Sequence, residues 1–262
     1  MNLFSKIEKG SPLLHRTGFG MMAAALIFLL TGAFDQTQVL GISAWTKPIK
    51  FALSIAIFVW TIALFLEPLG NWFARRWIAR VIAFSMIAEL ALITLQAGRG
   101  VPSHFNTRTS FDGNIFSAMG LLIVINTLAV AVMLLGYIWR GVDVHPLIAS
   151  AIRMGLLFFL AGSLVGMFMV VNMGHTIGAQ DGGAGLPFVN WSTGHGDLRI
   201  AHATGLHALQ VFPLIALLIL RFLPASSRVL QLSVLTVACL AYVAAFVFTL
   251  RQAVGGQPFL RL

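Results

Sequence analysis

The chain has few charged residues and a single cysteine. Asp, Glu, Lys and Arg make up 10% of its 262 residues, whereas 58% of the residues are hydrophobic. Soluble domains carry roughly 25% charged residues, so this composition excludes a water-soluble domain. The single Cys239 excludes a disulfide framework and a cysteine metal cluster. Long apolar runs fill the chain instead, with a mean hydropathy of +0.91.

Acidic residues are scarcer than basic ones. The chain has 8 Asp and Glu against 17 Lys and Arg, which gives a formal net charge of +9. Such an excess is typical of nucleic-acid-binding proteins, but the chain has no basic block with interleaved aromatic residues. Lys and Arg also collect at the cytoplasmic ends of membrane helices. We therefore interpret the charge as topological and expect no nucleic-acid partner.

The apolar runs are long enough to span a bilayer, which takes about 20 residues per helix. Hydropathy predicts spans at about residues 18–38, 48–69, 78–98, 114–139, 147–171, 201–223 and 229–252. The first run has a basic lead but lacks a small-x-small cleavage site, so we expect it to be retained. The sequence therefore predicts an all-α, polytopic integral membrane protein. We expect a bundle of seven transmembrane helices that forms a single domain over residues 1–262.

The distribution of Lys and Arg between the loops predicts the orientation of the bundle. Ten of the 17 lie at the amino terminus and after the second, fourth and sixth spans, and seven lie on the other side. Because positive charge is retained in the cytoplasm, this bias favours a cytoplasmic amino terminus and an external carboxyl terminus. Five of the 7 histidines then fall on the external side. We expect the membrane to be a bacterial inner (plasma) membrane.

The most polar passage runs from residue 172 to residue 210. It contains His175, Asp181, His195, Asp197, Arg199, His202 and His207. Irregular backbone is not tolerated against lipid, so this passage must lie over or inside a protein-lined cavity. We expect Asp197 to cap a helix that begins near Ile200. His207 and Gln210 share one stripe of this helix, and we predict that they face the cavity as catalytic residues. The alternative is that His207 only bonds a neighbouring helix.

Histidine and aspartate on the external side could form a metal site of the zinc-hydrolase kind. The candidate ligands for zinc or another divalent metal are His195, His202, His207 and Asp197, with one position open to water. His202 and His207 are roughly 140° apart on a straight helix, which cannot aim both at one ion. His104 and Asp112, after the third span, are candidate catalytic residues that would meet these histidines across the bundle. The alternative is a solvated polar loop with capping residues.

The order of Ser103, His104 and Asp112 is similar to that in the seven-helix zinc amidases typified by alkaline ceramidases. The resemblance implies a zinc-dependent amidase. The paired histidines of that family lie one helical turn apart on the last helix, whereas His202 and His207 are five residues apart on the sixth span. We therefore do not assign the chain to this family.

Several cationic side chains lie on the side where the positive-inside rule predicts few. The candidate ligand-binding residues are Lys47, Arg99, Arg199 and Arg251, together with Asn172 and Trp191. Cations that converge on the mouth of a cavity would attract a phosphate, a carboxylate or an anionic lipid headgroup. The alternative is that each cation extends toward the lipid phosphates, as long basic side chains do.

Glu89 and Asn126 are predicted at similar depth on consecutive spans. A carboxyl near the bilayer centre is costly unless it is neutral or paired. A protonated Glu89 bonded to Asn126 would join the two helices, whereas a titrating Glu89 would belong to a proton path. We favour the bond, because no chain of other acids continues toward the cytoplasm.

These residues leave several functions open. We rank first a metal-assisted enzyme that acts on a lipid or another membrane-soluble substrate, with histidine as ligand and acid–base. The alternative is a transporter or receptor for a small anionic solute. A subunit that holds haem or quinone ranks below both. Haem would need axial histidines on facing helices at matching depth, and only His207 is clearly embedded in a span. A purely structural subunit is the remaining reading. The expected partners are the lipid bilayer and a small-molecule or lipid substrate.

Overall fold

The computed structural model of the chain describes residues 2–187, 189–224 and 226–260. It is 73% helical, and of the eight α-helices among these residues seven are long and apolar enough to cross a membrane. The chain is therefore an all-α polytopic membrane protein, which confirms the fold class expected from hydropathy. The chain divides into two compact units, Met1–Asp143 and Val144–Leu262, here called unit 1 and unit 2. That the whole chain forms one domain stays a prediction.

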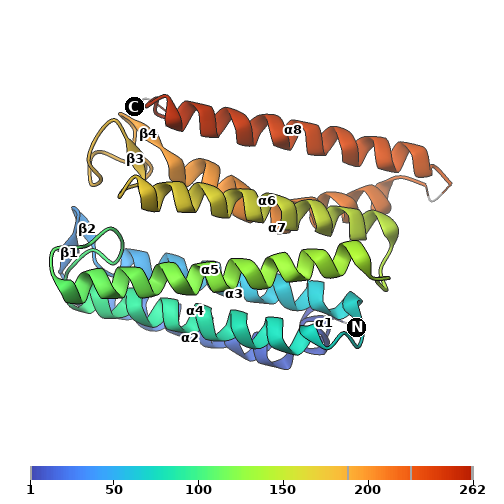
Figure 1. Ribbon diagram of the computed structural model, residues 1–262, viewed down its shortest axis with the longest axis horizontal. Coiled ribbons are helices and arrows are strands. Elements are labelled where there is room, and N and C mark those ends of the chain that lie inside the picture. Colours follow the sequence, from blue (N-terminus) through green and yellow to red (C-terminus); the bar gives the residue numbers. More distant parts are fainter. Residues whose placement is uncertain (1, 188, 225, 261–262) are drawn as a thin grey trace. The chain divides into compact units, whose positions relative to one another are not determined.

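Unit 1 runs from α1 to α5 (Figure 1). Its elements are α1 (Leu3–Gly10), α2 (Pro12–Phe34), β1 (Gln38–Val39), β2 (Ile42–Ser43), α3 (Thr46–Leu66), the 3-10 turn η1 (Glu67–Leu69), α4 (Ala74–Gly98) and α5 (Ser110–Trp139). The helix α2 packs on α3, and α4 packs on both α3 and α5. The strands β1 and β2 form a short antiparallel ribbon between α2 and α3. The short α1, which hydropathy did not predict, packs on α2 and α3.

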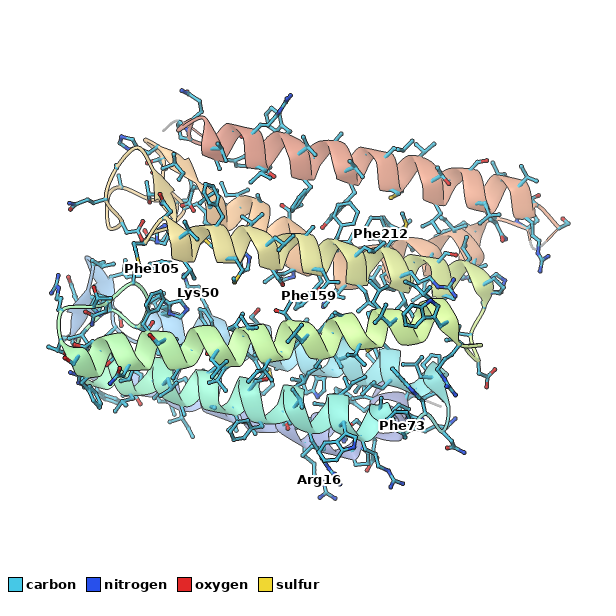
Figure 2. The ribbon with its side chains drawn as sticks, viewed as in Figure 1. Arg16, Lys50, Phe73, Phe105, Phe159 and Phe212 are labelled. Atoms are coloured by element: carbon cyan, nitrogen blue, oxygen red, sulfur yellow. The ribbon has the colours of Figure 1, made fainter. Side chains whose placement is uncertain are left out.

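The two ends of unit 1 carry different groups of side chains. Figure 2 shows Lys50 and Phe105 at one end of the unit, and Arg16 and Phe73 toward the other. The first end therefore holds the start of α3 and the connection between α4 and α5, where the predicted residues Lys47, Arg99 and His104 lie.

The first span begins and ends earlier than its predicted range of 18–38. The helix α2 begins at Pro12 because the Ser11 hydroxyl caps it, accepting the Leu14 N–H at 3.2 Å. It ends at Phe34, after which the Asp35 carboxylate accepts the Trp45 indole N–H at 2.7 Å. Basic residues in the first turns of α2 lower the local hydropathy, which is why a hydropathy window misses this start. The other spans differ from their predicted bounds by a few residues.

Unit 2 contains the three remaining long helices of the described chain. Its elements are α6 (Pro146–Val171), β3 (Thr176–Ile177), β4 (Gly196–Asp197), α7 (Leu198–Phe222) and α8 (Arg228–Val254). The helix α7 packs on both α6 and α8. Between α7 and α8, Phe212 is fully buried with its ring centroid 5.0 Å from that of Tyr242. The Tyr242 hydroxyl donates to the Thr204 carbonyl at 2.6 Å, which ties α8 to α7.

Glycines allow α6 and α7 to approach each other closely. A Cβ added at Gly162 would lie 2.9 Å from the Cα of Gly205, nearer than real Cβ atoms come. His202 fits into the same contact, with its Nδ1 2.8 Å from the Gly162 carbonyl oxygen, and a Cβ at Gly166 would touch its ring at 3.1 Å. Small residues and interhelical hydrogen bonds are the usual basis of helix packing in membranes. His202 therefore helps to hold α6 and α7 together.

Candidate functional site

The polar connection between α6 and α7 is anchored to both helices of unit 2. Asn172 ends α6, and its Nδ2 donates to the Gly174 carbonyl at 3.0 Å and to the Thr176 carbonyl at 3.4 Å. The ribbon of β3 and β4 then places Thr176 opposite Asp197, next to the start of α7. Asn172, predicted to bind ligand, thus shapes the connection through its backbone contacts.

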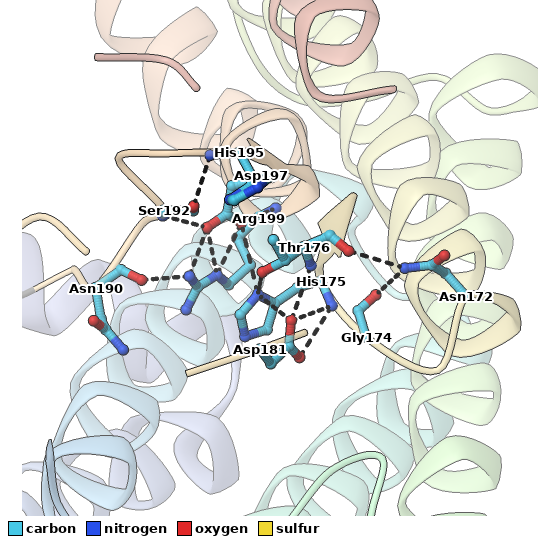
Figure 3. A network of polar contacts seen from close by, with 10 residues as sticks. All are labelled: Asn172, Gly174, His175, Thr176, Asp181, Asn190, Ser192, His195, Asp197 and Arg199. Carbon is cyan, nitrogen blue, oxygen red and sulfur yellow. Dashed lines mark hydrogen bonds and ion pairs between the residues drawn. The ribbon is translucent and has the colours of Figure 1, made fainter. Parts of the chain in front are cut away.

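Asp197 is the N-cap of α7, as the sequence predicts. Its side chain is 0% exposed and accepts the Arg199 backbone N–H at 3.0 Å and the Ser192 backbone N–H at 2.8 Å. The Arg199 guanidinium donates to the same carboxylate at two points, with Nε 2.9 Å from Oδ1 and Nη2 2.6 Å from Oδ2 (Figure 3). Nη2 also donates to the Asn190 carbonyl. The position of the guanidinium is therefore fixed by several bonds.

The pKa of Asp197 reflects a balance between burial and bonding. Burial alone would raise this pKa, because a buried carboxylate loses its hydration. The hydrogen bonds and charge of Arg199, with smaller contributions from the Ser192 N–H and His175, outweigh burial and lower the pKa below its ordinary value. Asp197 therefore remains ionised at neutral pH and keeps Arg199 in place.

A second carboxylate, Asp181, organises the start of the connection. It accepts the Thr176 backbone N–H at 3.0 Å, and its Oδ1 lies 3.1 Å from Nδ1 of His175. The same Nδ1 lies 4.0 Å from Oδ1 of Asp197, so His175 stands between the two carboxylates. Gly182 has a φ of 101°, which L residues rarely adopt, and this lets the chain turn directly after Asp181.

A cavity of about 280 Å³ opens within this network. Its described wall carries three basic side chains, His175, His195 and Arg199, and no acidic one. The carboxylates of Asp181 and Asp197 are not part of the described wall but pair with His175 and Arg199, respectively. Hydroxyl, amide, glycine and alanine residues complete the wall, namely Thr176, Ala179, Gln180, Gly182, Gly183, Ala184, Asn190, Ser192, Thr193 and Gly194. Guanidinium and imidazole groups at such a surface favour an anionic ligand.

The other predicted site residues of unit 2 lie outside the cavity wall. His207 is exposed on α7, and Gln210 is half-buried one turn further along the helix. Trp191 accepts the Leu186 N–H at its carbonyl at 2.8 Å and so shapes the connection. Arg251 is exposed in the last turn of α8. The predicted catalytic roles of His207 and Gln210 stay predictions.

The predicted metal ligands do not come together in the part of the chain that the structure describes. No group of three or more His, Cys, Asp or Glu side chains there is arranged to hold a metal ion. Asp197 is bonded to Arg199, and His202 contacts the Gly162 carbonyl. The geometry of these residues therefore gives the predicted zinc site no support.

In unit 1, Asp112 closes the connection between α4 and α5. Its Oδ1 accepts Gln96 Nε2 at 2.9 Å and Arg99 Nη1 at 2.5 Å, and its Oδ2 accepts the Thr109 hydroxyl at 2.7 Å. The Thr109 oxygen accepts the Asp112 backbone N–H at 3.1 Å in return, a reciprocal cap of α5. The Arg99 guanidinium lies 4.8 Å from the centroid of the Phe111 ring. These bonds assign Asp112 and Arg99 a structural part in unit 1.

His104 lies against Glu89 rather than against Asp112. Its Nε2 is 3.9 Å from Oε1 of Glu89, and its Nδ1 is 3.1 Å from the Ser103 hydroxyl oxygen. The Phe51 ring lies 5.9 Å from the His104 ring, and Lys47 Nζ lies 5.8 Å from the centroid of Phe51. Lys47, His104 and Glu89 therefore belong to one cluster within unit 1.

The predicted bond between Glu89 and Asn126 is wrong. The two carboxyl oxygens of Glu89 have no hydrogen-bond partner among the described residues. The side-chain carbonyl oxygen of Asn126 has none there either. At about 1.5 Å per residue, Glu89 lies roughly 14 Å below the end of α4, whereas Asn126 lies roughly 24 Å below the start of α5. The two side chains are thus at different depths.

Sequence reasoning did not assign His175, Asp181, Asn190 or Ser192 to the site. The Asp181-Gly182-Gly183 sequence was a usable signal, because an Asp before glycines typically bonds backbone N–H groups in a turn. Asn190 and Ser192 bond to Arg199 and Asp197 through backbone groups. Backbone donors and acceptors are common to nearly all residues, so no pattern of side chains could reveal these two.

Comparison with protein-family models, with curated proteins and with solved structures gives no match to this chain. The similarity of Ser103, His104 and Asp112 to zinc amidases gains no support from these comparisons. Any conclusion about function therefore rests on the chemistry of the site.

Proposed function

We propose that the cavity of unit 2 binds a small anionic solute, and that the chain is a transporter or receptor for it. The observation that supports this proposal is the separation of charge: His175, His195 and Arg199 line the cavity, whereas Asp181 and Asp197 are outside its described wall. The volume of about 280 Å³ lies at the lower edge of the roughly 300–1,000 Å³ typical of drug-sized ligands. It therefore suits a solute of a few heavy atoms that carries a carboxylate or phosphate.

Arg199 is the residue that would contact the anion most strongly. Its side chain is 23% exposed, and Nε and Nη2 are bonded to Asp197 and Asn190. These bonds hold the guanidinium in one position before a ligand arrives, which lowers the entropy lost on binding. Since Asp197 stays ionised, it keeps Nε and Nη2 of Arg199 bonded.

We further propose that the protein lies in a bacterial inner membrane, with its amino terminus in the cytoplasm and its carboxyl terminus outside. The loop distribution of the 17 Lys and Arg residues supports this orientation. The connection that forms the cavity then faces the external medium. A solute from outside would reach His195 and Arg199 without crossing the bilayer.

The proposal is tested by calorimetry on the purified protein with acetate and inorganic phosphate, and with acetamide as a neutral analogue of acetate. We expect binding of an anion and no binding of acetamide. Arg199→Gln removes a charged contact of about 1.5–3 kcal/mol, so it should weaken anion binding by roughly tenfold or more. Arg228→Gln is the matched control. It changes an exposed cation at the start of α8, and this variant should bind the anion normally. Equal binding of acetate and acetamide would contradict the proposal.

Uptake of the labelled anion into reconstituted vesicles separates the two forms of this proposal. Uptake that is lost in Arg199→Gln indicates a transporter. Binding without uptake indicates a receptor.

A second candidate is the membrane enzyme, which the pair of His175 and Asp181 favours. A carboxylate 3.1 Å from Nδ1 orients an imidazole and supports its positive charge, as general acid–base catalysis requires. The substrate would be a lipid or another membrane-soluble molecule. Metal analysis of the purified protein tests the zinc that was predicted from the sequence, and a Soret band would favour a haem subunit. Turnover that His175→Gln abolishes would establish the enzyme.

A further inference from the structure

Unit 1 contains a buried carboxyl that the cavity of unit 2 does not use. Glu89 on α4 is 1% exposed, and neither of its oxygens has a hydrogen-bond partner among the described residues. An ionised carboxylate in such a place is costly unless a charge or a proton reaches it. A structural acid would be expected to bond a neighbour, as Asp112 does in the same unit.

His104 connects this carboxyl to the surface of unit 1. Its Nε2 lies 3.9 Å from Oε1 of Glu89, about 1 Å beyond a hydrogen bond, so a small rotation of either side chain closes the gap. The His104 side chain is 26% exposed, whereas that of Glu89 is 2% exposed. On its other side, Nδ1 of His104 lies 3.1 Å from the Ser103 hydroxyl. The imidazole thus stands between a buried acid and water.

The charged groups around Glu89 come from few elements. From α3, Lys47 is the cation whose charge acts on the carboxyl. Arg99 and Asp112, at the ends of α4 and α5, are paired with each other. The titratable residues within α2, His15 and Arg16, lie in its first turns, and Figure 2 shows Arg16 far from the Lys50 end of the unit. His104 and Lys47 are therefore the titratable groups that the described contacts and charges place beside Glu89.

Apolar side chains occupy the neighbouring layer between α4 and α5. Ile93, one turn from Glu89, forms a buried cluster with Ile115 and Met119, and Phe51 of α3 packs against it. Such a layer offers the carboxyl no hydrogen bond. The route through His104 is therefore the polar one that the described contacts provide.

We propose that Glu89 is a proton-binding site that exchanges its proton, through His104, with water on the side of the α4–α5 connection. In the transfer, the N–H bond at Nε2 of a protonated His104 breaks and an O–H bond forms at Oε1 of Glu89. The imidazolium becomes a neutral imidazole and the carboxylate becomes a neutral acid. One proton moves and no electron does. The half-buried His104 then regains a proton from water, and the reverse steps release the proton from Glu89. If the chain is a transporter, as proposed above, a carboxyl that takes up its proton from one side supplies the proton whose movement drives solute transport.

Infrared difference spectroscopy on the intact protein tests this site. Spectra between about pH 9 and about pH 5 record the C=O stretch of a protonated carboxylic acid. We expect a band that is lost in Glu89→Gln and kept in Glu8→Gln, which changes an exposed glutamate of α1. After a rapid pH jump, the band should form at least about tenfold more slowly in His104→Ala, and added imidazole should restore the rate.

Several outcomes would overturn the proposal. An unchanged rate in His104→Ala would remove the relay. A carboxyl band that is absent throughout this pH range would exclude the proton site. A band that varies with sodium at fixed pH would also exclude it and would indicate a metal cation instead.

If Glu89→Gln does not fold, carboxyl-¹³C glutamate labelling of a Glu8→Gln, Glu67→Gln protein leaves Glu89 as the single glutamate of the chain. The NMR titration of that one resonance then decides the matter. Anion binding in unit 2 is measured separately, so failure of either proposal is recognised independently.

Discussion

The guanidinium of Arg199 contacts both carboxylate oxygens of Asp197, with Nε 2.9 Å from Oδ1 and Nη2 2.6 Å from Oδ2. The same carboxylate caps α7. One buried side chain therefore begins a membrane helix and also positions a cation in the wall of the cavity. This double role links the stability of unit 2 to the geometry of its site.

Asp197→Asn should destabilise unit 2 strongly. The change keeps the shape of the side chain but removes its charge, which leaves Arg199 partly buried without its partner. Breaking a buried pair in this way costs about 3 kcal/mol, reduced where the partner reaches water. Unfolding in detergent by denaturant measures the loss, and Asp143→Asn, at an exposed site, should cost less than about 0.5 kcal/mol. Similar losses in both variants would contradict this role of Asp197.

The depressed pKa of Asp197 predicts loss of stability in acid. Because the folded state lowers this pKa below the unfolded value of about 3.9, the stabilisation is fully present above that value. It is lost as the pH falls through the folded pKa, since protonation then breaks the pair with Arg199. Hydrogen exchange of residues 190–200 should therefore accelerate below about pH 4. The Asp197→Asn protein should lack this acid-induced step, and retention of the full step would exclude Asp197 as its source.

Gly205→Ala should weaken the contact between α6 and α7. A Cβ at Gly205 would lie 2.9 Å from the Phe158 carbonyl oxygen and would also meet the backbone of Gly162. Overpacking of this kind costs about 1–3 kcal/mol. Gly183→Ala is the control, since no atom of another described residue beyond its chain neighbours lies within 4 Å of its added Cβ, and it should leave the melting temperature nearly unchanged. A melting temperature for Gly205→Ala equal to that of the control would count against the close packing.

His202→Ala and His207→Ala should separate packing from binding. His202 contacts the Gly162 carbonyl at 2.8 Å, so its removal should lower stability by about 1 kcal/mol, as for a lost interhelical bond. His207 is exposed on α7, so its removal should spare the fold. Any loss of ligand binding or turnover in His207→Ala would then report a functional role. Thermal melts and ligand titration on both variants give the answer; early unfolding of His207→Ala alone would reverse the assignment.

Single cysteines should report the orientation in the membrane. Cys239 is buried at 7% exposure and gives little background. Gly183→Cys and Gly141→Cys both introduce a Cβ that no described residue beyond the chain neighbours approaches within 4 Å. In intact cells, a membrane-impermeant maleimide should label the cysteine at residue 183 and not the one at residue 141. The opposite labelling would invert the proposed topology.

The sequence by itself determined the fold class and the seven spans. Hydropathy is a sum over neighbouring residues, and the cost of placing a segment in lipid depends on that sum. The cap at Asp197 was predictable for a similar reason, because a cap depends on residues within one turn of a helix. Hydropathy did not predict the helix α1, because a window of about 19 residues averages an eight-residue helix with its surroundings.

Only the tertiary structure decided which polar groups meet. His175 bonds Asp181 through a turn that depends on Gly182, and Asp112 faces Gln96 and Arg99 across a helix connection. Glu89 meets His104 rather than Asn126 because antiparallel helices set the two side chains at different depths. The composition of each segment is a local property, but these contacts depend on turn geometry and helix register. Both are fixed by packing between residues that are far apart in the chain.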